Sequence, residues 1–313
     1  MQKKKKILIT GLGSIGQRYL RLFGEHPDFE IFALRTSRKA VRLTKNEIYT
    51  WEDAERLRPW AVLITNPTSM HLETALKCAN FGAHLFIEKP LGMTLKMLPA
   101  LQKVIKRKKL SAYVAYNLRF HPGLIDLKKE VEKRGFWNAQ VHYSSWLPEW
   151  RTGTDYSRSY SASRKMGGGV LLDLSHEADY VNWIFGPVRK IIGVASKVSK
   201  LKIDSEDSVD MIFCLENGAA IPLHLDFCSY NTERSIKVMT KDCFFHLDLV
   251  SNTLTRRDNH RESVRSYKID RDFTYKKQIE YFLAHAGKGK MLNSPGEAAN
   301  LLSKLLVFRK KSL

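Results

Sequence analysis

Residues 6–16 read KILITGLGSIG, and this stretch decides the fold. An apolar run typical of a buried strand leads directly into Gly11-Leu12-Gly13-Ser14-Ile15-Gly16, and a helical pattern follows over Gln17–Phe23. A strand, a G-x-G-x-x-G turn and a helix in this order are the fingerprint of dinucleotide binding. The first glycine permits the tight turn, the second lets a pyrophosphate approach the backbone, and the third lets the helix pack on the strand. The stretch therefore predicts a nucleotide-binding domain whose cofactor contacts include Gly11, Gly13, Ser14, Ile15 and Gly16.

Short apolar runs alternate with helical patterns over the first 120 residues, which is typical of a parallel sheet covered on both faces. The pattern indicates strands at 5–10, 30–34, 61–65, 84–88 and 112–116, and helices at 69–81 and 94–108. We therefore expect an α/β fold in which residues 1–121 form a Rossmann domain, a doubly wound parallel sheet.

After Pro122 the pattern changes to alternating strands. A helix (124–134), a long strand (139–147) and a helix (171–185) precede six alternating runs between residues 188 and 257, and two terminal helices follow at 274–285 and 295–309. The pattern predicts an α+β domain over residues 122–313, with a large, open and mostly antiparallel sheet. Whether the C-terminal helix packs back on the first domain stays open at this point.

Composition and charge limit the classes of protein. The chain has 313 residues, 43% of them hydrophobic, and no apolar run approaches the ~18 residues that cross a bilayer, so we expect no membrane association. The four cysteines show no zinc spacing, which predicts free thiols, a cytoplasmic location and no metal site. The net charge of +20 would suit a nucleic-acid binder, but no nucleic-acid-binding motif accompanies it. We therefore expect no nucleic acid, and infer that the charge favours anionic small molecules.

The end of the second predicted strand determines which dinucleotide is expected. NAD sites usually carry an acidic residue there, to bind the ribose 2′-hydroxyl. This chain has Arg35, Thr36, Ser37 and Arg38 instead. Because guanidinium groups bind phosphate with paired hydrogen bonds, these residues predict NADP as the preferred cofactor, with NAD as the alternative.

Polar residues follow two later strands, where the carboxyl ends of a parallel sheet line the ligand site. Asn66, Pro67 and His71 follow the third strand, and Glu88, Lys89 and Pro90 the fourth. A lysine beside a cationic nicotinamide would have its ammonium form disfavoured, which brings it toward a useful acid–base range. Lys89 is therefore a candidate acid–base residue, with an ordinary surface lysine as the alternative.

A second candidate group lies in GGGVLLDLSHEADY (167–180). Asp173 and His176, three apart on the expected helix, would share a face, so that the carboxylate could orient the imidazole for proton transfer. The preceding loop is rich in aromatic and arginine side chains, which suit a sugar ring and an anionic group. Its candidate substrate-binding residues are Trp150, Arg151, Tyr156 and Tyr160.

These motifs together resemble the glucose-fructose oxidoreductase, inositol dehydrogenase and MocA family of two-domain NAD(P)-dependent oxidoreductases. The resemblance rests on GLGSIG, TNPTSMH, EKP, YNLRFHP and GGGVLLDLSHEADY in this order, and it covers nearly the whole chain. One departure is the spacing D-x-x-H at Asp173 and His176, where many members have D-x-x-x-H. Two other segments, SWLPEWRTGTDYSRSYSASRK (145–165) and LHLDF (223–227), are similar to a branch of the family found in bacterial surface-polysaccharide and sialic-acid-like sugar pathways.

The resemblance implies further residue roles. Lys89 would position the reacting hydroxyl or carbonyl group, His176 would transfer the proton, and Asp173 would be its nearby acid. The cofactor would be bordered by Asn66, Pro67, His71, Glu88, Lys89 and Asn117, and the substrate by Arg119, Asp173 and His176 together with the loop residues. The family also implies a homo-oligomer, a dimer or tetramer formed through the C-terminal sheet.

The expected function is hydride transfer between NAD(P) and a sugar or sugar derivative. The basic charge predicts an anionic substrate, for example an acidic or nucleotide sugar of surface-polysaccharide biosynthesis. The alternative is a non-catalytic dinucleotide-binding sensor or regulator, which would have no use for the pairing of Lys89 with His176.

Overall fold

A computed structural model describes residues 4–24, 26–37, 41–151 and 153–312. The chain forms two compact units, and each is built from two separate parts of the sequence. The first unit contains Met1–Ala115 and Gln278–Ala299, and the second contains Tyr116–Lys277 and Asn300–Leu313. The C-terminal segment therefore contributes to both units, and its last helix begins in the first unit and ends in the second.

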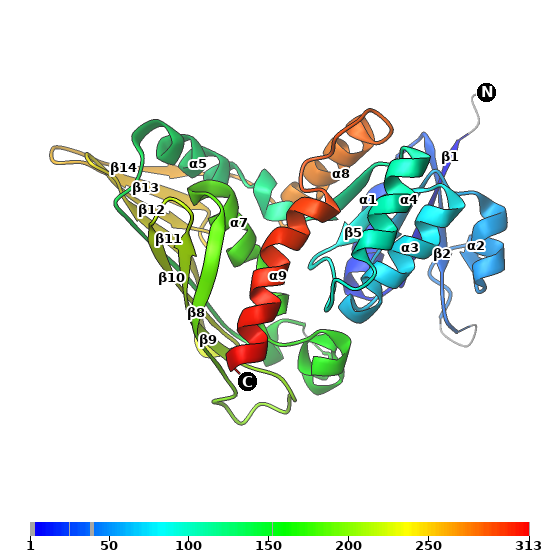
Figure 1. Ribbon diagram of the computed structural model, residues 1–313, viewed down its shortest axis with the longest axis horizontal. Coiled ribbons are helices and arrows are strands. Elements are labelled where there is room, and N and C mark those ends of the chain that lie inside the picture. The colour runs from blue at the N-terminus through cyan, green and yellow to red at the C-terminus, as the bar shows by residue number, and fades with distance from the viewer. Residues whose placement is uncertain (1–3, 25, 38–40, 152, 313) are drawn as a thin grey trace. The chain divides into compact units, whose positions relative to one another are not determined.

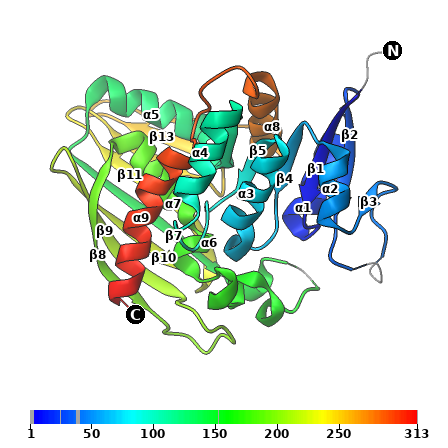
Figure 2. The ribbon, with the colours of Figure 1, turned by 45° about the vertical axis from the view of Figure 1, so that its right-hand side comes forward.

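The first unit is built on a six-stranded parallel sheet with the strand order β3-β2-β1-β4-β5-β6. This is the order of a doubly wound nucleotide-binding fold, which reverses direction between β1 and β4. Strands β1, β4 and β5 lie side by side in Figure 2, and most of their side chains are buried. The strands are β1 (Lys5–Thr10), β2 (Phe29–Leu34), β3 (Glu47–Ile48), β4 (Ala61–Ile64), β5 (His84–Glu88) and β6 (Ala112–Ala115).

The helices of this unit, apart from α2, are expected from the sequence. They are α1 (Ser14–Gly24), α2 (Trp51–Leu57), α3 (His71–Phe81), α4 (Leu98–Lys108) and the part of α8 (Phe273–His285) that begins at Gln278. Helix α4 begins four residues later than the sequence pattern indicates, because Pro99 occupies its first turn, where the missing amide proton costs nothing. Helix α2 and strand β3 are too short to produce a recognisable period, and sequence reasoning missed both.

The second unit is built on an eight-stranded sheet with the order β14-β13-β12-β11-β7-β10-β9-β8. All neighbours are antiparallel except β7 and β10, as expected for a mostly antiparallel sheet. Figure 1 shows α5 and α7 against one face of this sheet. The strands are β7 (Asn138–Trp146), β8 (Val188–Ser196), β9 (Ser208–Leu215), β10 (Ala220–Asp226), β11 (Cys228–Met239), β12 (Phe244–Asp248), β13 (Thr253–Arg257) and β14 (Glu262–Ser266).

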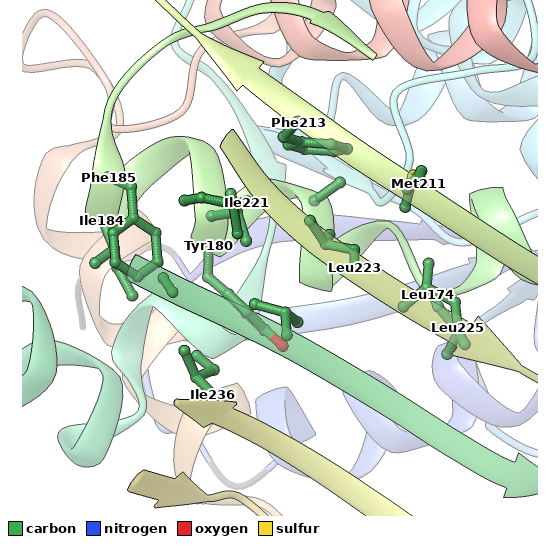
Figure 3. Packing of buried hydrophobic residues seen from close by; sticks show 14 of the residues in the cluster. Leu174, Tyr180, Ile184, Phe185, Met211, Phe213, Ile221, Leu223, Leu225 and Ile236 are labelled. Carbon is green, nitrogen blue, oxygen red and sulfur yellow. The ribbon is translucent and has the colours of Figure 1, made fainter. Parts of the chain in front are cut away.

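The core of the second unit lies between this sheet and its helices. Alternate residues of β9 and β10, such as Phe213 and Leu223, pack against Leu174 and Tyr180 in Figure 3. The other face of this C-terminal sheet, called the open face below, carries exposed apolar side chains, including Ile192, Val194 and Ile212. The helices are α5 (Pro122–Arg134), α6 (Val170–Asp173), α7 (Ser175–Phe185) and residues 300–312 of α9 (Pro295–Ser312).

The single helix expected over 171–185 is wrong, because the structure has two. Helix α6 ends at Asp173, Leu174 adopts φ −94° and ψ 28°, and α7 begins at Ser175. The Leu174 carbonyl accepts from the Glu177 amide, three residues on, instead of continuing the α-helical pattern. Asp173 and His176 therefore lie on different helices, and the expected sharing of one helix face does not apply to them.

Candidate functional site

The glycine turn of the first unit has the shape that a dinucleotide requires. Gly11 adopts φ +91°, and a Cβ atom at Gly16 would lie 2.1 Å from the Gly11 carbonyl oxygen and 2.9 Å from Thr65 Oγ1. At Gly13, by contrast, a Cβ atom would meet nothing within 4 Å. Gly16 is thus required for packing, while Gly13 leaves open space beside the N-terminus of α1, where backbone amides and the helix dipole favour a phosphate. Ser14 and Ile15 form the first turn of that helix.

Arg35, at the end of β2, is held by an acidic residue that sequence reasoning did not consider. Its Nη1 lies 2.9 Å from Glu47 Oε1 and 2.6 Å from the Val41 carbonyl oxygen. A hydrogen bond from Tyr49, assisted by Arg35, lowers the pKa of Glu47 to about 2. The guanidinium is therefore fixed in place beside Thr36 and Ser37, and Arg38 lies outside the described residues.

His71 holds the segment after β4 in place through two hydrogen bonds. His71 is buried, and its ring nitrogens lie 2.7 Å from the Pro90 carbonyl oxygen and 2.9 Å from the Asn66 carbonyl oxygen. Burial lowers the pKa of His71 to about 4, so the ring joins the loops after β4 and β5 without carrying a charge near neutral pH. Pro67 precedes the short 3₁₀ turn Thr68–Met70 that leads into His71.

The side chain of Asn66 offers a buried hydrogen-bond acceptor that a cofactor could use. Asn66 donates to Thr74 Oγ1 at 2.7 Å, while its own Oδ1 is buried without a hydrogen-bond partner among the described residues. Asn66 also lies against Gly11, because a Cβ atom there would be 3.1 Å from Asn66 Cα. An unsatisfied acceptor beside the glycine turn, together with the open space at Gly13, fits a bound dinucleotide.

Glu88 and Lys89 lie at the end of β5. Glu88 is buried and accepts a hydrogen bond from the Tyr19 hydroxyl at 2.5 Å, and Gln278 donates to that hydroxyl at 2.7 Å. Burial raises the pKa of Glu88. Lys89, joined to Pro90 by a cis peptide bond, is partly exposed. The candidate cofactor residue Glu88 is thus anchored by Tyr19 and Gln278, which sequence reasoning missed because they come from distant helices.

In the second unit Asn117 and Arg119 are each hydrogen-bonded to a residue that is distant in the sequence. Asn117 donates to Thr274 Oγ1 at 2.7 Å. The Arg119 guanidinium makes two parallel bonds to Asp179, at 2.8 and 2.7 Å, and both side chains are nearly buried. Paired bonds of this kind fix a guanidinium in one orientation.

The loop before α6 connects Arg151, Tyr160 and Asp173. The Tyr160 hydroxyl donates to Asp173 Oδ1, and the Arg151 guanidinium lies over the Tyr160 ring, 5.6 Å from its centre. Burial and the adjacent carboxylate raise the pKa of Tyr160, which keeps its hydroxyl a donor. The His176 ring meets Tyr116 edge-on, with 5.5 Å between ring centres. The Tyr160 phenol thus contacts the candidate acid directly, and the Arg151 guanidinium packs against the Tyr160 ring.

Two other loop residues anchor the loop to the sheet. Trp150 donates to Ser145 Oγ at 2.8 Å and meets Phe227 edge-on at 4.9 Å. The Tyr156 hydroxyl accepts from the Lys202 amide at 3.1 Å. Both side chains pack against the apolar core of the second unit. These contacts hold the loop in place, while Tyr160 contacts Asp173 and Arg151 packs on Tyr160.

Comparison with known proteins agrees with this geometry. Residues 5–116 match the family model described as "Oxidoreductase family, NAD-binding Rossmann fold", and residues 137–243 match the "GFO/IDH/MocA C-terminal domain". Among curated proteins, the chain is 29% identical to the rhizopine catabolism protein MocA of Rhizobium meliloti, over 68% of each chain. It is 23% identical to myo-inositol 2-dehydrogenase of Thermotoga maritima, over 98% of this chain and 96% of the relative. Some alignments are shorter and span as little as 35% of the relative.

A solved structure shares the fold over nearly the full length. UDP-N-acetylglucosamine 3-dehydrogenase of Acidithiobacillus ferrooxidans superposes with a TM-score of 0.79 at 18% identity, and 98% of each chain is covered. Both units of the present chain therefore have counterparts in one solved protein.

Proposed function

Because the chain belongs to the GFO/IDH/MocA oxidoreductase family, we propose that it catalyses NAD(P)-dependent oxidation or reduction of a sugar or sugar derivative. The observation that carries this proposal is the glycine turn at Gly11–Gly16, with its open space at Gly13 and the unsatisfied Asn66 Oδ1 beside it. A dinucleotide whose pyrophosphate is held at this turn would supply or accept the hydride through its nicotinamide. The residues of the chain then have to bind the substrate and move one proton.

Two residues are proposed to handle the proton. Lys89 directly follows β5, which ends at the candidate cofactor residue Glu88, and it positions the reacting hydroxyl or carbonyl group. His176, in the first turn of α7, exchanges the proton. Asp173 supports this step from α6, where the bond from Tyr160 holds its carboxylate. Because the helix is broken at Leu174, Asp173 and His176 do not share a helix face. The proposed supporting role of Asp173 therefore rests on its contact with Tyr160 of the loop.

We also propose a substrate that carries a phosphate or carboxylate, such as an acidic or nucleotide sugar. Its support is the net charge of +20 and one arginine of the loop, Arg151, which lies over the Tyr160 ring. A sugar ring would stack on an aromatic face of this loop, while Arg119, fixed by Asp179, would border the substrate.

A turnover panel tests the substrate proposal. Purified enzyme would be given myo-inositol, levoglucosan, glucuronic acid and UDP-N-acetylglucosamine, each with NAD⁺ and NADP⁺, and absorbance at 340 nm would be followed. We expect turnover of at least one compound, with the charged sugars giving the higher kcat/KM. Faster turnover of the neutral compounds would contradict the anionic substrate, and no turnover of any compound with either cofactor would favour a dinucleotide sensor.

NADP is proposed as the preferred cofactor because Arg35 is fixed at the end of β2 and the chain has Thr36, Ser37 and Arg38 next to it. Parallel fluorescence titrations with NADPH and NADH test this. We expect tighter binding of NADPH, and a loss of at least tenfold in NADPH affinity but not in NADH affinity for Arg35→Ala. Equal losses of affinity for both cofactors, or a preference for NADH, would show that Arg35 pairs with Glu47 to stabilise the fold and does not bind a 2′-phosphate.

The protein is further proposed to act in the cytoplasm as a homo-oligomer. The open face of the C-terminal sheet exposes Ile192, Val194 and Ile212 and is the surface through which copies would associate. Among the described residues, no helix combines the length and the apolar character needed to cross a membrane.

A further inference from the structure

Arg309, close to the end of α9, is buried although its neighbours Lys310 and Lys311 are exposed. Its Nη2 donates to the Gly168 carbonyl oxygen at 2.6 Å and to Glu206 Oε2 at 2.9 Å, and its Nε lies 3.2 Å from the same oxygen. The Glu206 side chain is fully buried. A buried arginine on the last helix thus binds both a carboxylate and the glycine turn that precedes α6.

The glycine turn fits closely between two groups of atoms. A Cβ atom at Gly169 would lie 2.4 Å from Glu206 Oε1 and 2.7 Å from Arg309 Nη2, and Gly169 adopts φ +105°. A Cβ atom at Gly168 would lie 2.3 Å from the Tyr160 carbonyl oxygen. The turn is therefore enclosed by Glu206 and Arg309 on one side and by the loop that carries Tyr160 on the other.

This turn is the start of the segment that carries the candidate acid–base residues. The Val170 amide donates to the Glu206 carbonyl oxygen at 3.0 Å, and the Asp173 amide donates to the Gly169 carbonyl oxygen at 3.0 Å. Asp173 ends α6, and His176 follows in the first turn of α7. Any displacement of Gly168 and Gly169 would move the beginning of α6 and, through Leu174, the beginning of α7.

Helix α9 has other anchors, so the ion pair is not needed merely to dock it. Leu301, Leu305 and Phe308 are buried in the core of the second unit. A buried ion pair gives little net stability, because desolvation opposes the attraction, but its hydrogen bonds fix geometry. The pair is therefore better suited to orienting the turn than to stabilising the fold.

We propose that Arg309 and Glu206 are positioning residues for the reaction. Arg309 holds the Gly168–Gly169 turn from α9 and Glu206 holds it from the segment before β9, and so they keep Asp173 and His176 in the orientation that proton transfer requires. The inference rests on the proposed function, because that function assigns the proton to His176.

The test is the ¹⁵N spectrum of the histidine rings in the full-length protein labelled with ¹⁵N-histidine. His176→Gln assigns the His176 signals by their disappearance. In Arg309→Met and Glu206→Gln we expect the His176 ring signals and their titration midpoint to shift, while the His224 signals stay in place. Arg309→Lys should restore part of the wild-type spectrum, since a lysine keeps the charge but not both bonds. Lys310→Met, on the same helix but exposed, is the matched control and should leave the spectrum unchanged.

Kinetics on the panel compound with the highest turnover give the second readout. We expect kcat of Arg309→Met to fall about tenfold, with KM and the Kd for NADPH within twofold of the wild type. Unchanged His176 signals in a folded Arg309→Met protein would overturn the proposal, whatever its melting temperature. If that variant does not fold, the double variant Arg309→Met/Glu206→Gln, which leaves no unpaired buried charge, decides in the same way. Absence of wild-type turnover would refute the proposed function, and the His176 spectrum would still decide the positioning role.

Discussion

At the scale of single residues, the two candidate acid–base side chains differ from the groups that surround them. Glu88, His71 and Asp173 are buried and held by specific partners. Lys89 and His176 are only partly buried, as expected for groups that exchange protons with a substrate. The buried neighbours set the position of each segment, and the partly exposed Lys89 and His176 are the residues proposed to carry out the chemistry.

Replacing either acid–base residue should slow turnover without removing the cofactor. For Lys89→Met and His176→Gln we expect kcat/KM to fall about 100-fold or more, the usual contribution of general acid–base catalysis. The Kd for NADPH, measured by fluorescence, should stay within about threefold of the wild-type value, because neither change alters the turn at Gly11–Gly16. Lys103→Met, at an exposed lysine of α4, is the control. Full turnover in both variants would show that these roles are wrong.

Gly16 should not tolerate a methyl group. In Gly16→Ala the new Cβ would lie 2.1 Å from the Gly11 carbonyl oxygen, so α1 has to shift away from β1. We expect weaker NADPH binding and a free energy of unfolding lower by about 1–3 kcal/mol, as for other overpacked sites. Urea unfolding and cofactor titration measure the two effects. Gly24→Ala, where a Cβ atom meets nothing within 4 Å, should behave like the wild type.

At the scale of elements, neighbouring strands place charged groups together on the open face of the C-terminal sheet. His224 on β10 lies between Asp210 of β9, at 2.7 Å from Nδ1, and Asp226, at 3.0 Å from Nε2. The His142 ring on β7 stacks on it with 4.9 Å between ring centres. The hydrogen bond that His224 donates to Asp226, and then the one that it donates to Asp210, raise its pKa to about 9, although burial opposes the shift.

This cluster predicts a pH dependence of stability. Because the pKa of His224 is higher in the folded than in the unfolded chain, where it is about 6.5, the folded state binds more protons between these values. The stabilisation is complete below pH 6.5, and it declines as the pH rises through about 9. Urea unfolding from pH 6 to pH 9.5 should show this decline, and His224→Gln should flatten it. His285→Gln, an exposed helix position, should keep the wild-type slope; an equal slope in His224→Gln would contradict the assignment.

At the scale of the whole molecule, each unit is completed by a distant part of the chain. Residues 278–299 belong to the first unit and residues 300–313 to the second, so α9 begins in one and ends in the other. Gln278 contacts Tyr19 in the first unit, and Arg309 contacts Gly168 in the second. The C-terminal segment therefore supports residues next to both candidate acid–base groups.

The open face of the sheet should determine the oligomeric state. We expect the wild-type protein to be a dimer or tetramer by light scattering after size-exclusion chromatography. Ile192→Glu and Ile212→Glu place charges among exposed apolar side chains on this face and should dissociate it. Met97→Glu, at an exposed position of the first unit, is the control and should not change the mass. A monomeric wild type, or unaffected oligomers in both sheet variants, would exclude this surface.

The sequence by itself determined the features that depend on local pattern. The parallel sheet, the glycine turn and most strands of the second unit follow from apolar periodicity and turn residues, because neighbouring residues impose these structures. Family membership followed from the order of the motifs, which is also local information. The order of the strands in the first sheet could be expected as well, since the fingerprint implies it.

Only the tertiary structure decided which side chains support the candidate site. The pairing of Arg35 with Glu47, of Asp173 with Tyr160, and of Arg309 with Glu206 joins residues 12, 13 and 103 positions apart. No periodicity reports such pairs, because a buried polar group is satisfied by whichever donor the packed fold brings to it. The break between α6 and α7 has the same origin: the hydrogen bonds of Gly169 and Leu174 set the helix ends, where the apolar pattern alone runs on through both helices.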